Sequence, residues 1–267
     1  MGVAMSNNQE NIFANPEQTL EMAKHYFREG SWADVETLCG KLISHRADDA
    51  HAWFLRGLNE QAQGRHGAAL DYFTQVKNAP ELSVHLHLAA GISLAETGEP
   101  DKARAEFQHV LDFQPDNAQA HFWLGLMLKA KTDWKAARTY FRRATLLDPE
   151  LASAYFELGS LALAEGKFDE AVTALGKAAK RLPESPEVVN NLALALQGAG
   201  EAAQAETQYR RTLALNPDFA EAHCNLGILL FNLGRKEEAT PFLDRGTTLK
   251  PELKEFVDAA LGAAANP

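Results

Sequence analysis

The nine histidines are the side chains of this sequence best suited to metal binding or proton transfer. His85 and His87 are the closest pair, but residues two positions apart on a helix point to different faces. His51 and His85 occupy the same place in successive copies of a repeat that runs through the chain. Equivalent positions on stacked helices are separated by about 8 to 10 Å or more, too far to share a metal ion. We therefore expect both to hydrogen-bond or to contact a ligand, with a metal site or a proton switch as the alternative.

The sequence patterns of common catalytic sites are missing from the chain. It contains no G-x-S-x-G, no glycine-rich phosphate loop, no H-E-x-x-H and no Cys-x-x-Cys. The two cysteines, Cys39 and Cys224, belong to the first and last repeats and are expected to be too far apart to form a disulfide. The sequence therefore predicts a protein that is not an enzyme and that has no catalytic residues, metal site or cofactor.

A sequence repeat is expected to determine where the histidines and cysteines lie. The copy at residues 118–151 shows the pattern of the repeat most clearly. The residues before the first copy, 1–15, are polar and are expected to form a flexible lead-in. Each repeat is expected to form two helices joined by a short turn. The seven repeats are 16–49, 50–83, 84–117, 118–151, 152–185, 186–219 and 220–253.

Small, bulky, glycine and proline residues each keep a fixed place in the repeat. Glycine recurs between the two helices, with Thr132 as the exception, and proline closes five of the second helices. Bulky residues at the twenty-fourth position are expected to fill the space between helix pairs, with Cys39 in that place in the first repeat. The eighth position, where two helices must approach closely, is always small: Ala23, Gly57, Gly91, Gly125, Gly159, Ala193 and Gly227.

This combination of positions, together with the length of the repeat, resembles the tetratricopeptide repeat family. The resemblance implies an all-α fold in which antiparallel helix pairs stack into a right-handed superhelix, with the first helix of each pair on the concave side. Beyond the repeats, residues 254–264 carry an apolar side and are expected to form a helix that caps the open end. The tail is then 265–267.

Residues at the second, fifth, sixth and ninth positions of each repeat are expected to face the concave groove. In the middle of the chain most of them are apolar, and a contiguous exposed apolar patch usually marks an interaction surface. The alternative is that these side chains pack on one another across adjacent helices. The predicted apolar anchors are Phe54, Leu55, Leu58, Leu88, Ile92, Phe122, Trp123, Leu126 and Phe156.

The later repeats present polar groups to the same groove. Asn191 and Asn225 both occupy the sixth position, and they resemble the asparagine ladder with which some members of the family hold an extended peptide backbone. Glu157 and Asn190 lie beside them in the predicted lining.

Charged residues bear on the choice of partner. The formal net charge of -10 disfavours nucleic acid and anionic membranes as partners, and no apolar run approaches the roughly 20 residues of a membrane-spanning helix. Arg56 and Glu60 are four residues apart and can pair. The apolar side of their helix indicates either a ligand surface or, as the simpler and preferred account, a partly buried ion pair between repeats. A basic group that includes Arg138 and Arg142 is expected to be a solvated helix face, with binding of an anion or of an acidic partner as the alternative.

Together these features predict a repeat scaffold that binds a protein segment, either an amphipathic helix or an extended peptide, in its concave groove. One alternative is a carrier of an apolar small molecule such as a lipid or sterol, with His51, His85 and Glu157 orienting a polar group. Another is the specificity arm of a larger enzyme. A cytoplasmic location is expected, or a periplasmic one if a leader has been removed.

Overall fold

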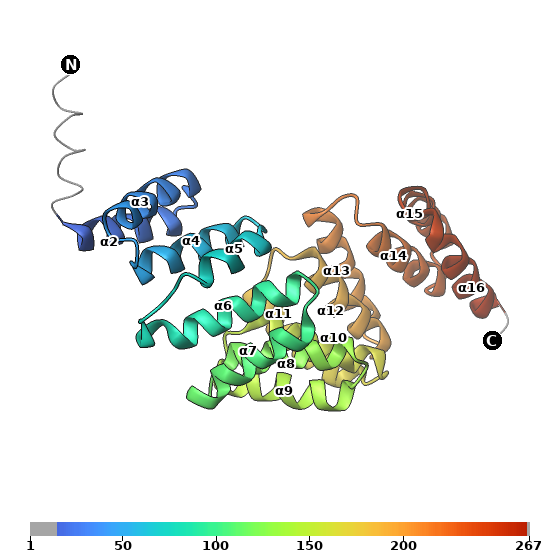
Figure 1. The fold of residues 1–267 in the computed structure, drawn as a ribbon. Coiled ribbons are helices and arrows are strands. Elements are labelled where there is room, and N and C mark those ends of the chain that lie inside the picture. The colour runs from blue at the N-terminus through green and yellow to red at the C-terminus, as the bar shows by residue number, and fades with distance from the viewer. Residues whose placement is uncertain (1–14, 266–267) are drawn as a thin grey trace, which may run out of the picture. The chain divides into compact units, whose positions relative to one another are not determined.

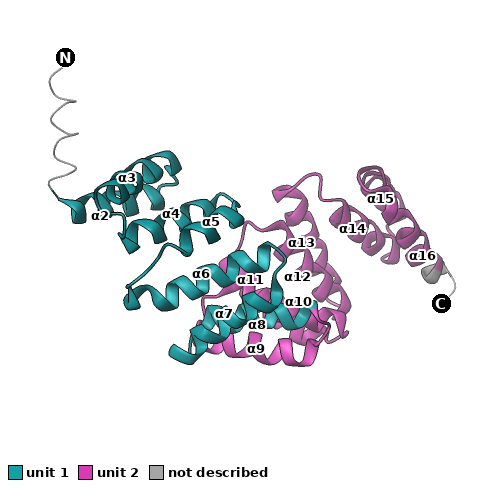
Figure 2. Cartoon of the chain, in the orientation of Figure 1, with its two compact units in different colours: residues 1–130 teal, residues 131–267 magenta. Residues whose placement is uncertain are grey.

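A computed structural model describes residues 15–265, and within this range the chain is all-helical, with no β-strand (Figure 1). This confirms the predicted all-α fold. The chain divides into two compact units, unit 1 at residues 1–130 and unit 2 at residues 131–267 (Figure 2). The division falls inside the fourth repeat, between its two helices.

Unit 1 holds three complete helix pairs and the first helix of the fourth repeat. Short turns join the two helices of each pair, and each pair packs against the next. Its helices are α2 (Pro16–Arg28), α3 (Trp32–His45), α4 (Ala50–Ala62), α5 (His66–Phe73), η1 (Pro80–Leu82), α6 (Ser83–Glu96), α7 (Pro100–Phe113) and α8 (Ala118–Ala130).

Unit 2 begins with the second helix of the fourth repeat, followed by three complete pairs and a final helix. Its helices are α9 (Trp134–Leu147), α10 (Ala152–Ala164), α11 (Phe168–Arg181), α12 (Pro186–Gly198), α13 (Ala202–Leu215), α14 (Ala220–Asn232), α15 (Lys236–Leu249), η2 (Pro251–Leu253) and α16 (Lys254–Ala265).

Six of the seven first helices begin at the first residue of their repeat. The third repeat differs, because the short helix η1 precedes α6, which starts at Ser83, one residue before the repeat. The second helix of the preceding repeat, α5, has only 8 residues. Pro80, one residue earlier than the other closing prolines, opens η1. The predicted lead-in lies outside the described residues except for Asn15, whose side chain caps α2, and α16 reaches Ala265, one residue beyond the predicted cap.

The turns inside the helix pairs adopt the left-handed backbone conformation that the glycine pattern predicts. The glycines there have φ between +68° and +83°, where a side chain causes steric strain. Thr132 takes the same place with φ of +60° and is therefore a strained position. The six glycines are Gly30, Gly64, Gly98, Gly166, Gly200 and Gly234.

The small residue at the eighth position makes room for the bulky residue at the twenty-fourth position of the same repeat. A methyl group added at Gly91 would lie 2.7 Å from the ring of Phe107, and one at Gly159 would lie 2.4 Å from Leu175. Phe107 and Leu175 are both fully buried. The sequence predicted that the residue at the twenty-fourth position fills the space between one helix pair and the next. The structure shows that it also packs against the other helix of its own pair.

Helix α16 covers one face of the last helix pair. Val257 is 4% exposed and packs against Cys224 and Ile228 of α14, with Leu253 and Leu261 beside it. The last pair is itself tightly packed, since a methyl group on Gly246 would lie 2.5 Å from Cys224 Sγ.

Candidate binding surfaces

The first helices of unit 1 carry a surface of half-buried apolar side chains. Phe54 and Leu58 of α4 pack on a cluster formed by Ala69, Phe73 and Ala89, and the Phe54 and Phe73 rings are 5.8 Å apart. Helix α4 packs on α6, and α6 packs on α8, so their side chains lie along neighbouring helices. The half-buried apolar residues are Phe54, Leu58, Leu88, Ile92, Phe122, Trp123 and Leu126.

The sixth position of the repeat faces the second helix of the preceding repeat in two cases. Leu55 is 6% exposed and belongs to the core that α3 forms around Leu38 and Leu42, so it presents no surface to a groove. Trp123 stacks on the buried ring of Phe107 in α7, with 5.8 Å between centroids and an interplanar angle of 11°. Leu55 is therefore a core residue, and Trp123 serves in part to join two repeats.

Some histidines of unit 1 lie close to carboxylates. His51 Nε2 is 3.5 Å from Glu81 Oε1, whereas His85 is exposed to solvent. His87 Nδ1 is 2.6 Å from Glu106 Oε2, and its ring lies 5.2 Å from that of His109. Within residues 15–265, no three histidine, cysteine or acidic side chains are arranged to hold a metal ion.

Arg56 and Glu60 do not pair with each other. Arg56 forms two hydrogen bonds to Glu36 of the preceding repeat and one to the Tyr72 hydroxyl, and its guanidinium lies 4.5 Å from the centre of the Tyr72 ring. Glu60 instead accepts hydrogen bonds from Arg65, which hold the pKa of the Glu60 carboxyl below its ordinary value despite burial. The preferred account, an ion pair between repeats, is confirmed for Arg56, which pairs with Glu36.

The first helices of unit 2 combine an apolar anchor with buried amides. Phe156 of α10 is half-buried and packs on the clusters around Ala178 and Leu175. Asn190 is 5% exposed, and its Oδ1 atom has no hydrogen-bond partner among the described residues, as is also true of Ser160 Oγ. Buried polar atoms of this kind are normally satisfied by water or by a ligand.

The remaining polar residues of the predicted lining differ in exposure. Asn191 and Glu157 are half-buried, whereas Asn225 is 8% exposed. The two rungs of the predicted asparagine ladder are therefore not equally accessible.

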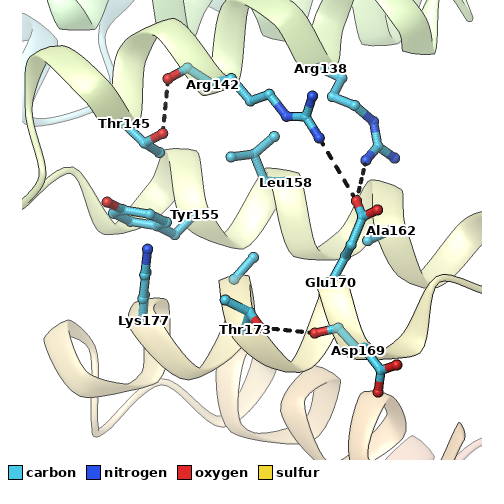
Figure 3. A pocket seen from close by; sticks show the side chains of 11 residues that line it. Arg138, Arg142, Thr145, Tyr155, Leu158, Ala162, Asp169, Glu170, Thr173 and Lys177 are labelled. Atoms are coloured by element: carbon cyan, nitrogen blue, oxygen red, sulfur yellow. Dashed lines mark hydrogen bonds and ion pairs between the residues drawn. The ribbon is translucent and has the colours of Figure 1, made fainter. Parts of the chain in front are cut away.

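A cavity among the helices of unit 2 involves residues that the predicted site did not contain. It has a volume of about 420 Å³ and is lined by the second helices α9 and α11 and the first helix α10 (Figure 3). Arg138 and Arg142 come from α9, Tyr155 and Leu158 from α10, and Lys177 from α11.

The expectation of a solvated basic face is wrong for Arg138, because only 12% of its side chain is exposed. Arg138 Nη2 lies 2.8 Å from Glu165 Oε2, and Arg138 Nη1 lies 3.0 Å from Glu170 Oε2. Arg142, with 62% of its side chain exposed, fits the expectation. The sequence signal that points to this cavity is the set of basic residues one turn apart on the second helix of the fourth repeat.

The fold and its repeated contacts define a tetratricopeptide repeat protein. More specifically, the chain belongs to the family described as the cilia and flagella-associated protein 70 C-terminal domain, which matches residues 13–260. We found no significant match among curated proteins.

Several solved structures share the fold at low sequence identity. PilF of Pseudomonas aeruginosa superposes with a TM-score of 0.67 at 21% identity, covering 79% of this chain and 98% of PilF. Cut9, in the APC/C hetero-tetramer Cut9–Hcn1, gives 0.70 at 15% identity, covering 91% of this chain and 48% of Cut9. MamA from Desulfovibrio magneticus RS-1 gives 0.57 at 17% identity, covering 64% of this chain and 97% of MamA.

The described helices are unlike membrane spans. None of those between residues 15 and 265 combines the length and the apolar character that crossing a bilayer requires.

Proposed function

We propose that the protein is a non-enzymatic scaffold and that the first helices of unit 1 bind an apolar segment of a protein partner. The tetratricopeptide repeat fold is consistent with a protein-interaction scaffold, and Cut9, which shares it, occurs in a hetero-tetramer with Hcn1. A partner helix with apolar side chains at helical spacing suits such a surface.

One observation carries the proposal: apolar side chains on three neighbouring first helices are only half-buried by the chain itself. Phe54 on α4, Leu88 on α6 and Phe122 on α8 each keep part of their surface open, whereas the sixth-position Leu55 does not. Removing such apolar area from water contributes about 25 cal/mol per Å², so a partner that covers it gains affinity. The half-buried Asn191 and Glu157 of unit 2 are proposed to bind polar groups of a partner.

The test pans a random peptide library displayed on phage against the protein and measures dissociation constants of the enriched peptides. The double variant Phe122→Ala and Leu126→Ala removes exposed apolar surface without removing Trp123, which stacks on the core. We expect it to weaken binding at least about tenfold. Phe113→Ala on the second helix α7, where 65% of the residue is exposed, is the control and is expected to bind normally.

A second experiment on the same purified protein distinguishes this function from that of a small-molecule carrier. Solvent extraction followed by mass spectrometry is expected to show no lipid in stoichiometric amount. A lipid or sterol present at about one molecule per chain would replace the proposal with the carrier function. If the peptides bound the double variant as tightly as the native protein, the first helices of unit 1 would not be the binding surface.

A further inference from the structure

The cavity of unit 2 shares no residue with the first-helix surface proposed above. Helices α9 and α11 form its walls, and Leu158 and Ala162 of α10 contribute an apolar floor (Figure 3). Its volume of about 420 Å³ falls in the range of roughly 300 to 1,000 Å³ that is typical of ligand sites.

At one end of the cavity the charges are satisfied within the chain. Arg138 is held between Glu165 and Glu170, and Arg142 Nη2 lies 3.9 Å from Glu170 Oε2. Lys167 Nζ lies 2.8 Å from Glu165 Oε2, and its hydrogen bond, followed by that of Arg138, holds the pKa of the Glu165 carboxyl below its ordinary value. The carboxylates of Glu165 and Glu170 are therefore already paired with cations of the chain.

At the other end a cation has no carboxylate partner. Lys177 Nζ lies 5.2 Å from the centre of the Tyr155 ring and forms no ion pair with any described residue. Figure 3 shows Lys177, Tyr155 and Thr145 gathered at this end, away from Glu170. The Tyr155 hydroxyl makes no hydrogen bond to any of residues 15–265 and is free to donate one.

The geometry of Tyr155 fixes this arrangement. Tyr155 is 9% exposed and packs against Ala178 and Val188, while the Arg181 guanidinium lies 5.2 Å from the centroid of its ring. Arg181 Nη2 is in turn held 2.8 Å from Glu150 Oε1, so its charge is already paired. Lys177 thus remains the cation that is available to a ligand at this end.

We propose that this cavity binds an acidic peptide segment, with a carboxylate at Lys177 and Tyr155 and an adjacent apolar side chain on Leu158. The lysine supplies the charge, the tyrosine hydroxyl a directed hydrogen bond, and the alanine and leucine floor accepts the apolar neighbour. At the far end Asp169, which forms no ion pair with the described residues, accepts hydrogen bonds from the peptide N–H groups. The protein then has two binding sites, with the acidic segment held between the second helices of unit 2.

The test uses an octapeptide library with a fixed Glu-Leu pair among random neighbours and a matched library with Gln-Leu. Binding of both to the full chain is measured by fluorescence anisotropy, and tight binders are titrated individually. We expect the Glu-Leu library to bind preferentially, and Lys177→Gln to weaken its binding about five- to tenfold. Raising the salt concentration is expected to weaken it further, because the contact is charged and partly open.

Lys180→Gln is the matched control, since Lys180 is exposed on the same helix but does not line the cavity. It removes the same charge and is expected to leave the affinity unchanged. Circular dichroism checks that both variants are folded. Equal loss in the two variants, or equal binding of the Glu-Leu and Gln-Leu libraries, would overturn the proposal. Loss of binding in the Phe122→Ala and Leu126→Ala variant would also overturn it, because that variant changes only the surface of unit 1.

Discussion

At the scale of single residues, the glycine at the eighth position of five repeats shows how a missing side chain makes room for close packing between two helices. Glycine inside a helix costs about 1 kcal/mol relative to alanine, so its presence needs a packing reason. At Gly91 the reason is Phe107, whose fully buried ring would lie 2.7 Å from an added methyl group. The ring cannot move away easily, because Trp123 stacks on it.

Replacing Gly91 with alanine is therefore expected to destabilise the protein, although alanine is the better helix former. Overpacking costs typically about 1 to 3 kcal/mol, which exceeds the gain in helix propensity. The free energy of unfolding from urea denaturation measures the difference.

Gly176→Ala provides the matched control, because Gly176 lies within α11 and an added methyl group would meet no atom within 4 Å. It is expected to stabilise the protein by up to about 1 kcal/mol. If both alanine variants gained stability alike, close packing at the eighth position would not be what selects glycine there.

At the scale of helices, charged networks join the second helices of neighbouring repeats. Glu206 of α13 accepts a hydrogen bond at Oε2 from Arg235 Nη1, 2.6 Å away, at the start of α15. Its Oε1 atom also forms an ion pair with Arg210 Nη2, 2.8 Å away on the same helix. The hydrogen bond from Arg235, followed by that from Arg210, holds the pKa of the Glu206 carboxyl below its ordinary value, against the effect of burial. With 18% of its side chain exposed, Glu206 is less screened than a free surface group.

This network makes part of the stability depend on pH in the acid range. Because the pKa of Glu206 is lower in the folded state, its contribution is present above the unfolded value of about 4.3 and is lost as pH falls through the folded value. Glu206→Gln is expected to lower the free energy of unfolding by about 1 kcal/mol at pH 7, with the deficit shrinking toward pH 3.

Urea denaturation between pH 3 and pH 7 measures this deficit. Glu237→Gln serves as the control, since Glu237 is exposed on α15 and forms no ion pair with a described residue. It should match the native protein throughout the range. A deficit for Glu206→Gln that stays constant with pH would show that its carboxylate charge contributes nothing.

The helices themselves were largely predictable because their signals are local. Proline at Pro16 and Pro186 opens two first helices, and the glycines between helices supply the left-handed turns. Such residues act through their own backbone, so their regular spacing defines the repeat without knowledge of any partner. The early Pro80, which opens a short helix before α6, was visible in the sequence, but the early end of α5 at Phe73 was not.

The contacts between repeats were harder to predict, because they join residues that no local period connects. Arg56 pairs with Glu36, 20 residues earlier, in preference to Glu60 on its own helix. Arg138 is similarly covered by Glu165 and Glu170 of the next repeat. Side-chain reach and partner choice across helices decide such pairs, and the cavity beside Arg138 depends on them.

At the scale of the whole molecule, the array is held together by contacts between neighbouring elements, and each compact unit has a core of its own. In unit 1 the fully buried Phe107 belongs to α7, and in unit 2 the fully buried Leu175 belongs to α11. Unit 2 contains a further cluster around Leu226 and Tyr209. In repeat arrays the free energy of unfolding is close to a sum of terms for single repeats and for contacts between neighbouring repeats. A core substitution is therefore expected to destabilise mainly the helices next to it.

Hydrogen exchange of the two core variants Phe107→Ala and Leu175→Ala tests this locality. Each removes a side chain that is 0% exposed, which costs about 2 to 5 kcal/mol. Phe107→Ala is expected to lower protection of the amides of α6 and α7 while α12 and α13 keep native rates. Leu175→Ala is expected to do the reverse, lowering protection in α10 to α12 and leaving α2 to α4 unchanged. Since each variant is the control for the other, equal loss of protection across both units in both proteins would mean that the array unfolds as one cooperative body.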